Sequence, residues 1–153
     1  SGTAGVPWAG TFTGDPLAAA VAKRQLELVI EQDLCARAAA LADRIRPRLL
    51  GLKERNEVIG DVRGMGLYFV LDVVADRESR EPHPALAERI RVNALELGVV
   101  LIAVKNFVRI CPPLVVTEDQ LEDIVDRVEE AVNRAEAQLH AGELPASVQQ
   151  VGL

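Results

Sequence analysis

The stretch EVIGDVRGMGLYFVLDVV, residues 57–74, decides the fold class, because it is rich in β-branched and aliphatic side chains and is interrupted by glycines. This composition predicts two strands, at about residues 58–63 and 67–74, with a turn at the glycines between them. The second strand stays largely apolar on both faces until Asp72, which favours a sheet covered on one side and partly on the other. A glycine pair after a strand also occurs in dinucleotide-binding loops. Here the third glycine is absent and a strand follows, so a turn is the favoured interpretation.

Two helices are predicted before this strand pair. Asp15 followed by Pro16 is typical of an N-cap and a first helical position, and the helix is expected to run to about residue 32. A second helix is expected from Asp33, because apolar residues then recur at helical spacing. These residues are Leu34, Ala38, Leu41, Ile45 and Leu49. Pro47 falls inside this repeat, so we expect a kink or a break there.

A polar loop, a third helix and a second strand pair are predicted after residue 74. Pro84 is a favourable first residue for the helix, and Gly98 is a typical stop. The apolar runs VVLIAV and FVRICP, residues 99–104 and 107–112, predict two short strands with a turn at Lys105-Asn106.

The last predicted helix follows a capping box. Thr117 and Gln120 have the Thr-x-x-Gln spacing of that motif, and apolar residues recur at helical spacing to about residue 139. The acidic residues of this segment are expected on its solvent-facing side. Strands in pairs with helices between them predict an α+β fold, with helices on one face of a small, mainly antiparallel sheet.

Composition and charge exclude several classes of protein. The chain has 153 residues, 49% of them hydrophobic and 26% charged, which is typical of a folded globular protein. A formal net charge of −6, without a basic run, argues against binding to nucleic acid or to a membrane surface. No apolar run is long enough to span a bilayer.

The cysteines and histidines offer no metal site. Cys35 and Cys111 lie far apart without a CxxC partner, which favours buried or half-buried free thiols in a reducing cytoplasm. His83 and His140 are the only histidines and belong to no cluster of ligand residues.

The segment GTFTGDP, residues 10–16, is the first candidate binding site. A glycine-rich turn at a helix start presents backbone N–H groups and the positive end of the helix dipole to an anion. Thr11 and Thr13 have hydroxyls that suit a phosphate, and Gly14 lies in the turn. Helix capping explains the same residues without a ligand, and both interpretations stay open at this level.

Arg109 is the second candidate, because it interrupts an otherwise apolar strand between Val108 and Ile110. A guanidinium in that position needs a partner or access to water, since an unpaired buried charge is costly. The partner is either an internal carboxylate or the carboxylate of a ligand, which guanidinium geometry suits.

Three segments in this order resemble the C-terminal part of class-III (ω-amino-acid type) pyridoxal-phosphate-dependent aminotransferases. The segment GTFTGDPLAAAVAKRQLEL resembles the family's Gly-Thr-Phe-x-Gly-Asn-Pro-Leu-Ala motif, and VIGDVRGMGLYFVLDVV resembles its Val-Gly-Asp-Val-Arg-Gly-x-Gly-Leu strand pair. The segment VRICPPLVVTEDQLEDIVDRVEEAV resembles its Arg-x-x-Pro-Pro-Leu-x-x-Thr-Glu-Glu motif and closing helix. Together they span nearly all of residues 11–139.

The resemblance implies a fold, a cofactor and roles for named residues. The fold would be the small C-terminal domain of fold-type I enzymes, and the reaction would move an amino group from a donor to a keto acid or aldehyde. Thr11 and Gly14 would contact the phosphate of pyridoxal phosphate bound by the neighbouring subunit of a homodimer. Arg109 would bind the carboxylate of an amino- or keto-acid substrate.

The sequence departs from the family pattern in two places and lacks one essential residue. Asp15 stands where Asn is usual, and the segment between Val100 and Arg109 is shorter than is common. The family's Schiff-base lysine has no match, because Lys23, Lys53 and Lys105 all lie outside its motif. We therefore expect a C-terminal domain or fragment that is inactive alone.

The expected parts are an interfacial phosphate-binding loop at residues 1–15, a small domain at 16–139 and a flexible tail at 140–153. The alternative is a stand-alone, non-catalytic α+β module for binding or oligomerisation.

Overall fold

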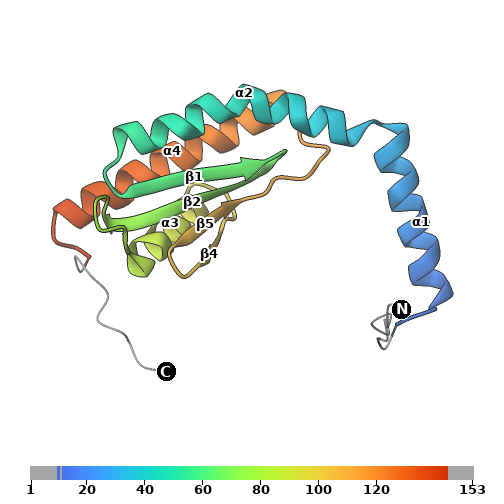
Figure 1. The fold of residues 1–153 in the computed structure, drawn as a ribbon, viewed down its shortest axis with the longest axis horizontal. Helices are drawn as coiled ribbons and strands as arrows, with labels where there is room; N and C mark the ends of the chain where they lie inside the picture. The colour runs from blue at the N-terminus through green and yellow to red at the C-terminus, as the bar shows by residue number, and fades with distance from the viewer. Residues whose placement is uncertain (1–9, 11, 145–153) are drawn as a thin grey trace, which may run out of the picture. The chain divides into compact units, whose positions relative to one another are not determined.

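The computed structural model describes residues 10 and 12–144. Within them the chain forms two compact units. The first reaches residue 35 and contains helix α1, and the second begins at residue 36 and contains the sheet and the remaining helices (Figure 1). The predicted α+β class is confirmed.

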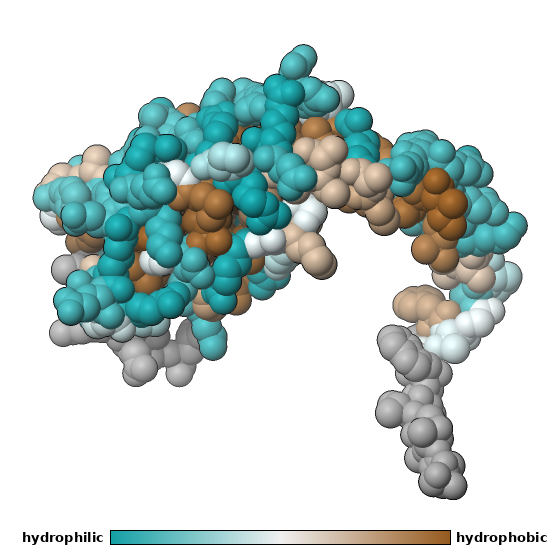
Figure 2. All heavy atoms as spheres, turned by 45° about the horizontal axis from the view of Figure 1, so that its top comes forward, coloured by the Kyte–Doolittle hydropathy of each residue, from teal (hydrophilic) through white to brown (hydrophobic). Residues whose placement is uncertain are grey.

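Helix α1 (Pro16–Glu31) begins where the sequence predicts. The Asp15 carboxylate accepts a hydrogen bond of 2.7 Å from the Ala18 N–H, and Pro16 occupies the first turn. No residue of the helix is buried. Its exposed apolar side chains are visible in brown on this helix in Figure 2, and those of this unit are Phe12, Leu17, Val21, Leu26 and Ile30.

Helix α2 (Leu34–Arg55) continues through Pro47, so the break that proline predicts does not occur. Ile45 lies before the proline, Leu49 and Leu52 lie after it, and all three are fully buried in one core. Burial of these side chains on both sides of Pro47 favours a continuous helix over the loss of one backbone hydrogen bond.

The sheet is antiparallel, as predicted. Its strands lie in the order β1 (Ile59–Met65), β2 (Tyr68–Asp76), β5 (Phe107–Ile110) and β4 (Ile102–Val104), and β3 (Glu81–Pro82) also pairs with β2. The short β3 lies inside the predicted polar loop. Strand β5 ends before its predicted end at residue 112, because Pro112 and Pro113 have no N–H to donate to a ladder.

Alternation along β2 and β5 gives the sheet two different faces. Phe69, Leu71 and Val108 point to one face and are buried, whereas Val70 and Arg109 point to the other and are half-buried. We call these the core face and the outer face.

Helices α2, α3 (Pro84–Glu96) and α4 (Glu118–His140) pack on the core face. The buried His83 is the N-cap of α3, and its Nδ1 accepts a hydrogen bond from the Leu86 N–H. The predicted capping box of α4 is present, with Thr117 and Gln120 exchanging hydrogen bonds. Helices on one face of the sheet are therefore confirmed.

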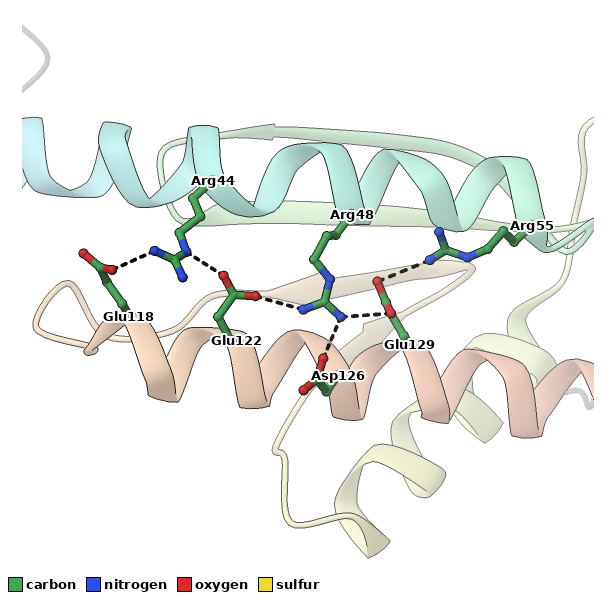
Figure 3. A network of polar contacts seen from close by, with 7 residues as sticks. All are labelled: Arg44, Arg48, Arg55, Glu118, Glu122, Asp126 and Glu129. Atoms are coloured by element: carbon green, nitrogen blue, oxygen red, sulfur yellow. Dashed lines mark hydrogen bonds and ion pairs between the residues drawn. The ribbon is translucent and has the colours of Figure 1, made fainter.

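Ion pairs join α2 to α4 along their length (Figure 3). Arg48 is the centre of this ladder, because its guanidinium lies within 2.9 Å of carboxylate oxygens of Glu122, Asp126 and Glu129. Arg44 contacts Glu118 and Glu122, and Arg55 contacts Glu129. The hydrogen bond from Arg44, and then that from Arg48, holds the pKa of Glu122 below its ordinary value of 4.5. The acidic side of α4 thus faces a basic side of α2 as well as solvent.

Candidate functional site

The loop before α1 contains the predicted phosphate contacts. Thr11 lies outside the described residues. Gly14 has a φ of +83°, and an added Cβ would meet nothing within 4 Å. A glycine is favoured there by its left-handed backbone, and the space beside it is open.

Several backbone N–H groups of this loop already have partners inside it. The Gly10 N–H donates to the Thr13 hydroxyl, the Thr13 N–H to the Gly10 carbonyl, and the Asp15 N–H to the Phe12 carbonyl. The Asp15 carboxylate takes the Ala18 N–H and brings a negative charge to the helix start. The described residues therefore offer little to an anion beyond the open side of Gly14.

Arg109 lies on the outer face of β5, in the middle of the sheet. It pairs with Val70 of β2 on one side and Ile102 of β4 on the other. Its guanidinium is half-buried, and no described residue gives it a hydrogen bond, an ion pair or a ring contact. Among the described residues, the internal salt bridge that the sequence left open for Arg109 is not formed.

A shallow, open pocket of about 560 Å³ lies over this part of the outer face. Strands β1, β2, β4 and β5 supply its lining, which consists of Arg63, Gly64, Tyr68, Val70, Val104, Phe107 and Arg109. The walls next to Arg109 are mostly apolar, and two guanidinium groups are the only charged groups in the lining. Such a combination suits an anionic group attached to an apolar body.

Arg63 of β1 is the second cation of the pocket, and sequence reasoning missed it. It pairs with Val70, so Arg63, Val70 and Arg109 form one row across three strands. Unlike Arg109, it has partners. Its Nε lies 3.4 Å from Asp61, its Nη2 lies 3.9 Å from Asp72, and its guanidinium lies over the Phe107 ring at 5.9 Å from the centroid.

Asp72 lies beside the pocket, opposite the lining residue Phe107 in the β2–β5 register. It is 8% exposed and accepts a hydrogen bond of 2.6 Å from the buried Asn106 amide. Arg80 also contacts it, at 3.3 Å. No local pattern marks Asp72 in the sequence, because its partners come from three separate segments.

The cysteines, the potential metal ligands and the helices of the described part of the chain suggest no second site. Cys35 and Cys111 are free, as expected, but both are exposed, so the expectation that they are buried or half-buried is wrong. No group of histidine, cysteine, aspartate or glutamate residues in the described part of the chain is arranged to hold a metal ion. Among the described helices, none has the length and apolarity needed to cross a membrane.

The fold is of the α+β class, with helices on the core face of an antiparallel sheet and, on its outer face, a half-apolar pocket lined by an arginine that no described residue pairs with. A family model described as aminotransferase class-III matches residues 3–132. The chain belongs to the aminotransferase class-III family, as its three motifs predict. Pyridoxal phosphate is the cofactor of that family.

Relatives of two activities resemble this chain. It is 37% identical over 123 residues to leucine/methionine racemase of Thermococcus litoralis, covering 80% of this chain and 28% of that protein. It is 36% identical to alanine/serine racemase of Pyrococcus horikoshii, over 80% of this chain and 26% of that protein. It is 31% identical to 5-aminovalerate aminotransferase DavT of Pseudomonas aeruginosa, over 74% of this chain and 27% of that protein. The chain thus spans between 26% and 28% of the length of these relatives.

Solved transaminases share the fold. An amine transaminase from an uncultivated Pseudomonas species, in its PLP-bound form, has a TM-score of 0.77 at 35% identity, over 83% of this chain and 29% of that one. A fourfold mutant of a thermostable ω-transaminase from Pseudomonas jessenii has a TM-score of 0.79 at 29% identity, over 88% of this chain and 31% of that one.

Proposed function

We propose that this chain supplies the substrate-carboxylate site of a pyridoxal-phosphate-dependent aminotransferase, which moves an amino group from a donor to a keto acid or aldehyde. The observation that carries the proposal is the Arg109 guanidinium, which lines an open pocket and has no partner among the described residues. A guanidinium in that setting gains most from a ligand carboxylate, which it binds through two parallel hydrogen bonds. Membership of the family supports the same role.

The cofactor contact rests on the loop before α1. Thr11 would hold the cofactor phosphate through its hydroxyl, and the open side of Gly14 leaves room for the phosphate to approach. This contact would be made to the neighbouring subunit of a homodimer. The chain would supply this one contact and not the whole cofactor site, because its three lysines lie outside the Schiff-base motif. When bound, pyridoxal phosphate supplies the electron sink for chemistry at the amino-bearing carbon.

The chain's own residues would bind and orient the substrate. Arg109 would fix the carboxylate, and Val70, Val104 and Phe107 would exclude water from the substituent beside it. We propose that residues 16–139 act as the C-terminal small domain, with 1–15 as the interfacial loop and 140–153 as a tail. Free, exposed cysteines support a cytoplasmic location, where thiols stay reduced.

Racemisation of an amino acid is a second candidate reaction. Two of the relatives described above are racemases, at 37% and 36% identity. An amino-acid substrate has a carboxylate in either reaction, so Arg109 would have the same binding role in each. The two reactions differ in whether the amino group leaves the substrate carbon.

One incubation separates these reactions. The full-length gene product, loaded with pyridoxal phosphate, is given single L-amino acids with pyruvate, and products are resolved by chiral chromatography. New alanine supports amino-group transfer, and the D-enantiomer of the supplied amino acid supports racemisation. Neither product from any amino acid would contradict both and favour the non-catalytic module.

The cofactor role has a separate test with a matched control. Thr11→Val should lower retention of pyridoxal phosphate, read from its absorbance after dialysis, in the full-length protein. Thr13→Val removes the neighbouring hydroxyl, which bonds only within the loop among the described residues. Equal retention in Thr11→Val and the unmodified protein would contradict the phosphate contact.

A further inference from the structure

We infer that the Arg109 pocket takes a monocarboxylic amino or keto acid with an apolar substituent and discriminates against a second acid group. This inference rests on the proposed carboxylate role of Arg109 and adds the class of substrate. It follows from the difference between the two guanidinium groups that line one pocket.

The two cations are placed for a ligand with two acid groups. Arg63 and Arg109 flank Val70 in one cross-strand row, so their backbones are two strand spacings, about 10 Å, apart. Long arginine side chains span that separation. By position alone, the pocket would therefore favour a dicarboxylate.

The contacts of Arg63 remove that preference. Its Nε faces Asp61 at 3.4 Å and its Nη2 faces Asp72 at 3.9 Å, so the Nε–Nη2 edge of its guanidinium already lies beside two carboxylates. Each of these carboxylates also forms a second ion pair. Lys53 contacts Asp61 at 3.6 Å, and Arg80 contacts Asp72 at 3.3 Å. A second acid group of a ligand would have to displace them or lie beside two negative charges.

The rest of the lining favours an apolar body. Val70, Val104 and Phe107 lie around Arg109, and the Phe107 ring is kept in place by the Arg63 guanidinium above it. The Tyr68 hydroxyl is the remaining polar side-chain group in the lining, and it carries no charge. One carboxylate on Arg109 and an apolar substituent on these walls therefore satisfy the pocket.

The test is a titration of the 153-residue chain followed by NMR at the arginine Nε–H groups. The probes are 4-methyl-2-oxopentanoate, a monoacid with an apolar end, and 2-oxoglutarate, a diacid. We expect both to shift the Arg109 signal and the monoacid to bind more tightly. Asp61→Asn should release Arg63 and improve binding of the diacid relative to the monoacid by about two- to fivefold, the range of one exposed ion pair. Arg109→Gln should abolish binding of both acids, followed in this variant at the Arg63 Nε–H and the backbone amides.

The outcomes distinguish failure of this inference from failure of the proposed carboxylate role of Arg109. One contrary result is that the unmodified chain binds 2-oxoglutarate more tightly than the monoacid and that Arg63→Gln removes this preference. That result would show that Arg63 binds the second acid group, and it would overturn this inference without affecting the carboxylate role of Arg109. An unchanged ratio of the two affinities in Asp61→Asn, with its amide spectrum intact, would also overturn it. Absence of any Arg109 shift with either acid would contradict the carboxylate role and the inference together.

Discussion

Arg63 and Arg109 pair with the same residue, Val70, from opposite sides, yet their surroundings differ in kind. Arg63 lies beside two carboxylates and over an aromatic ring. Arg109 has no such contact with any residue that the structure describes. An arginine left unpaired in the middle of a sheet contributes little to stability, and this contrast is the reason for assigning it to a ligand.

Asp72 is expected to contribute more to stability than the other carboxylate beside it on the outer face, Asp61. Asp72→Ala should lower the free energy of unfolding by about 1–3 kcal/mol, because the buried Asn106 amide loses its acceptor. Asp61→Ala is the matched control, since Asp61 lies opposite Asp72 in the β1–β2 register and, among the described residues, makes only ion pairs. The Asp61→Ala variant should lose less than about 1 kcal/mol of unfolding free energy. Urea unfolding measures both, and equal losses would contradict this account of Asp72.

Gly64 and Gly66, two glycines of the β1–β2 hairpin, are expected to differ in how well they tolerate substitution by alanine. An added Cβ at Gly64 would meet the Phe69 ring at 2.4 Å and the Tyr68 carbonyl at 2.6 Å. Gly64→Ala should therefore cost about 3 kcal/mol or more. At Gly66, with a φ of +53°, the nearest atom is the Ala38 Cβ at 3.9 Å, so Gly66→Ala should cost only about 1 kcal/mol of backbone strain. Thermal unfolding of both variants tests the difference, and the reverse order would contradict it.

Arg48 should contribute more to stability than any single exposed ion pair, because three carboxylates of α4 share it. We expect Arg48→Met to lower the free energy of unfolding by about 1 kcal/mol at low ionic strength, with a smaller loss in molar salt. Arg24→Met is the control, since Glu27 and Glu31 of its own helix are the only ion-pair partners of Arg24 in the part of the chain that the structure describes. A loss for Arg48→Met that does not change with salt would contradict an electrostatic role.

Acid should weaken the contact between α2 and α4. The pKa of Glu122 is lower in the folded chain than its ordinary value of 4.5, because Arg44 and then Arg48 hydrogen-bond its carboxylate. The stabilisation is therefore present in full above that ordinary value and is lost as pH falls through the folded pKa. Glu122→Gln should reduce the slope of unfolding free energy against pH in this acidic range. An identical slope in the variant would contradict the assignment.

The local elements of this fold are predictable from sequence because their signals lie within a few residues. Asp15 and Pro16 start α1, and Thr117 and Gln120 start α4, as the structure confirms. Pro47 is the exception. Its local preference for a break is outweighed by the burial of Ile45 and Leu49 on either side, which depends on the whole core.

The candidate site is less predictable because it depends on strand register. Arg109 is recognisable as a charge in an apolar strand, but its lack of a partner depends on which residues lie opposite in β2 and β4. The sequence does not mark Arg63 as a site residue, because its place in one row with Arg109 depends on the pairing of both β1 and β5 with β2. The arginine ladder between α2 and α4 is likewise a product of packing, since its partners are 74 to 78 residues apart.

The most direct test of the carboxylate role compares two substrates of the full-length gene product that differ only in that group. Arg109→Gln is assayed on an accepted amino acid and on the amine that lacks its carboxylate. Because no described residue loses an ion pair in this variant, its unfolding midpoint should stay close to that of the unmodified protein. We predict a fall of about a hundredfold in kcat/KM for the amino acid, with little change for the amine. An equal effect on both substrates, or none on either, would contradict the assignment of Arg109 to the substrate carboxylate.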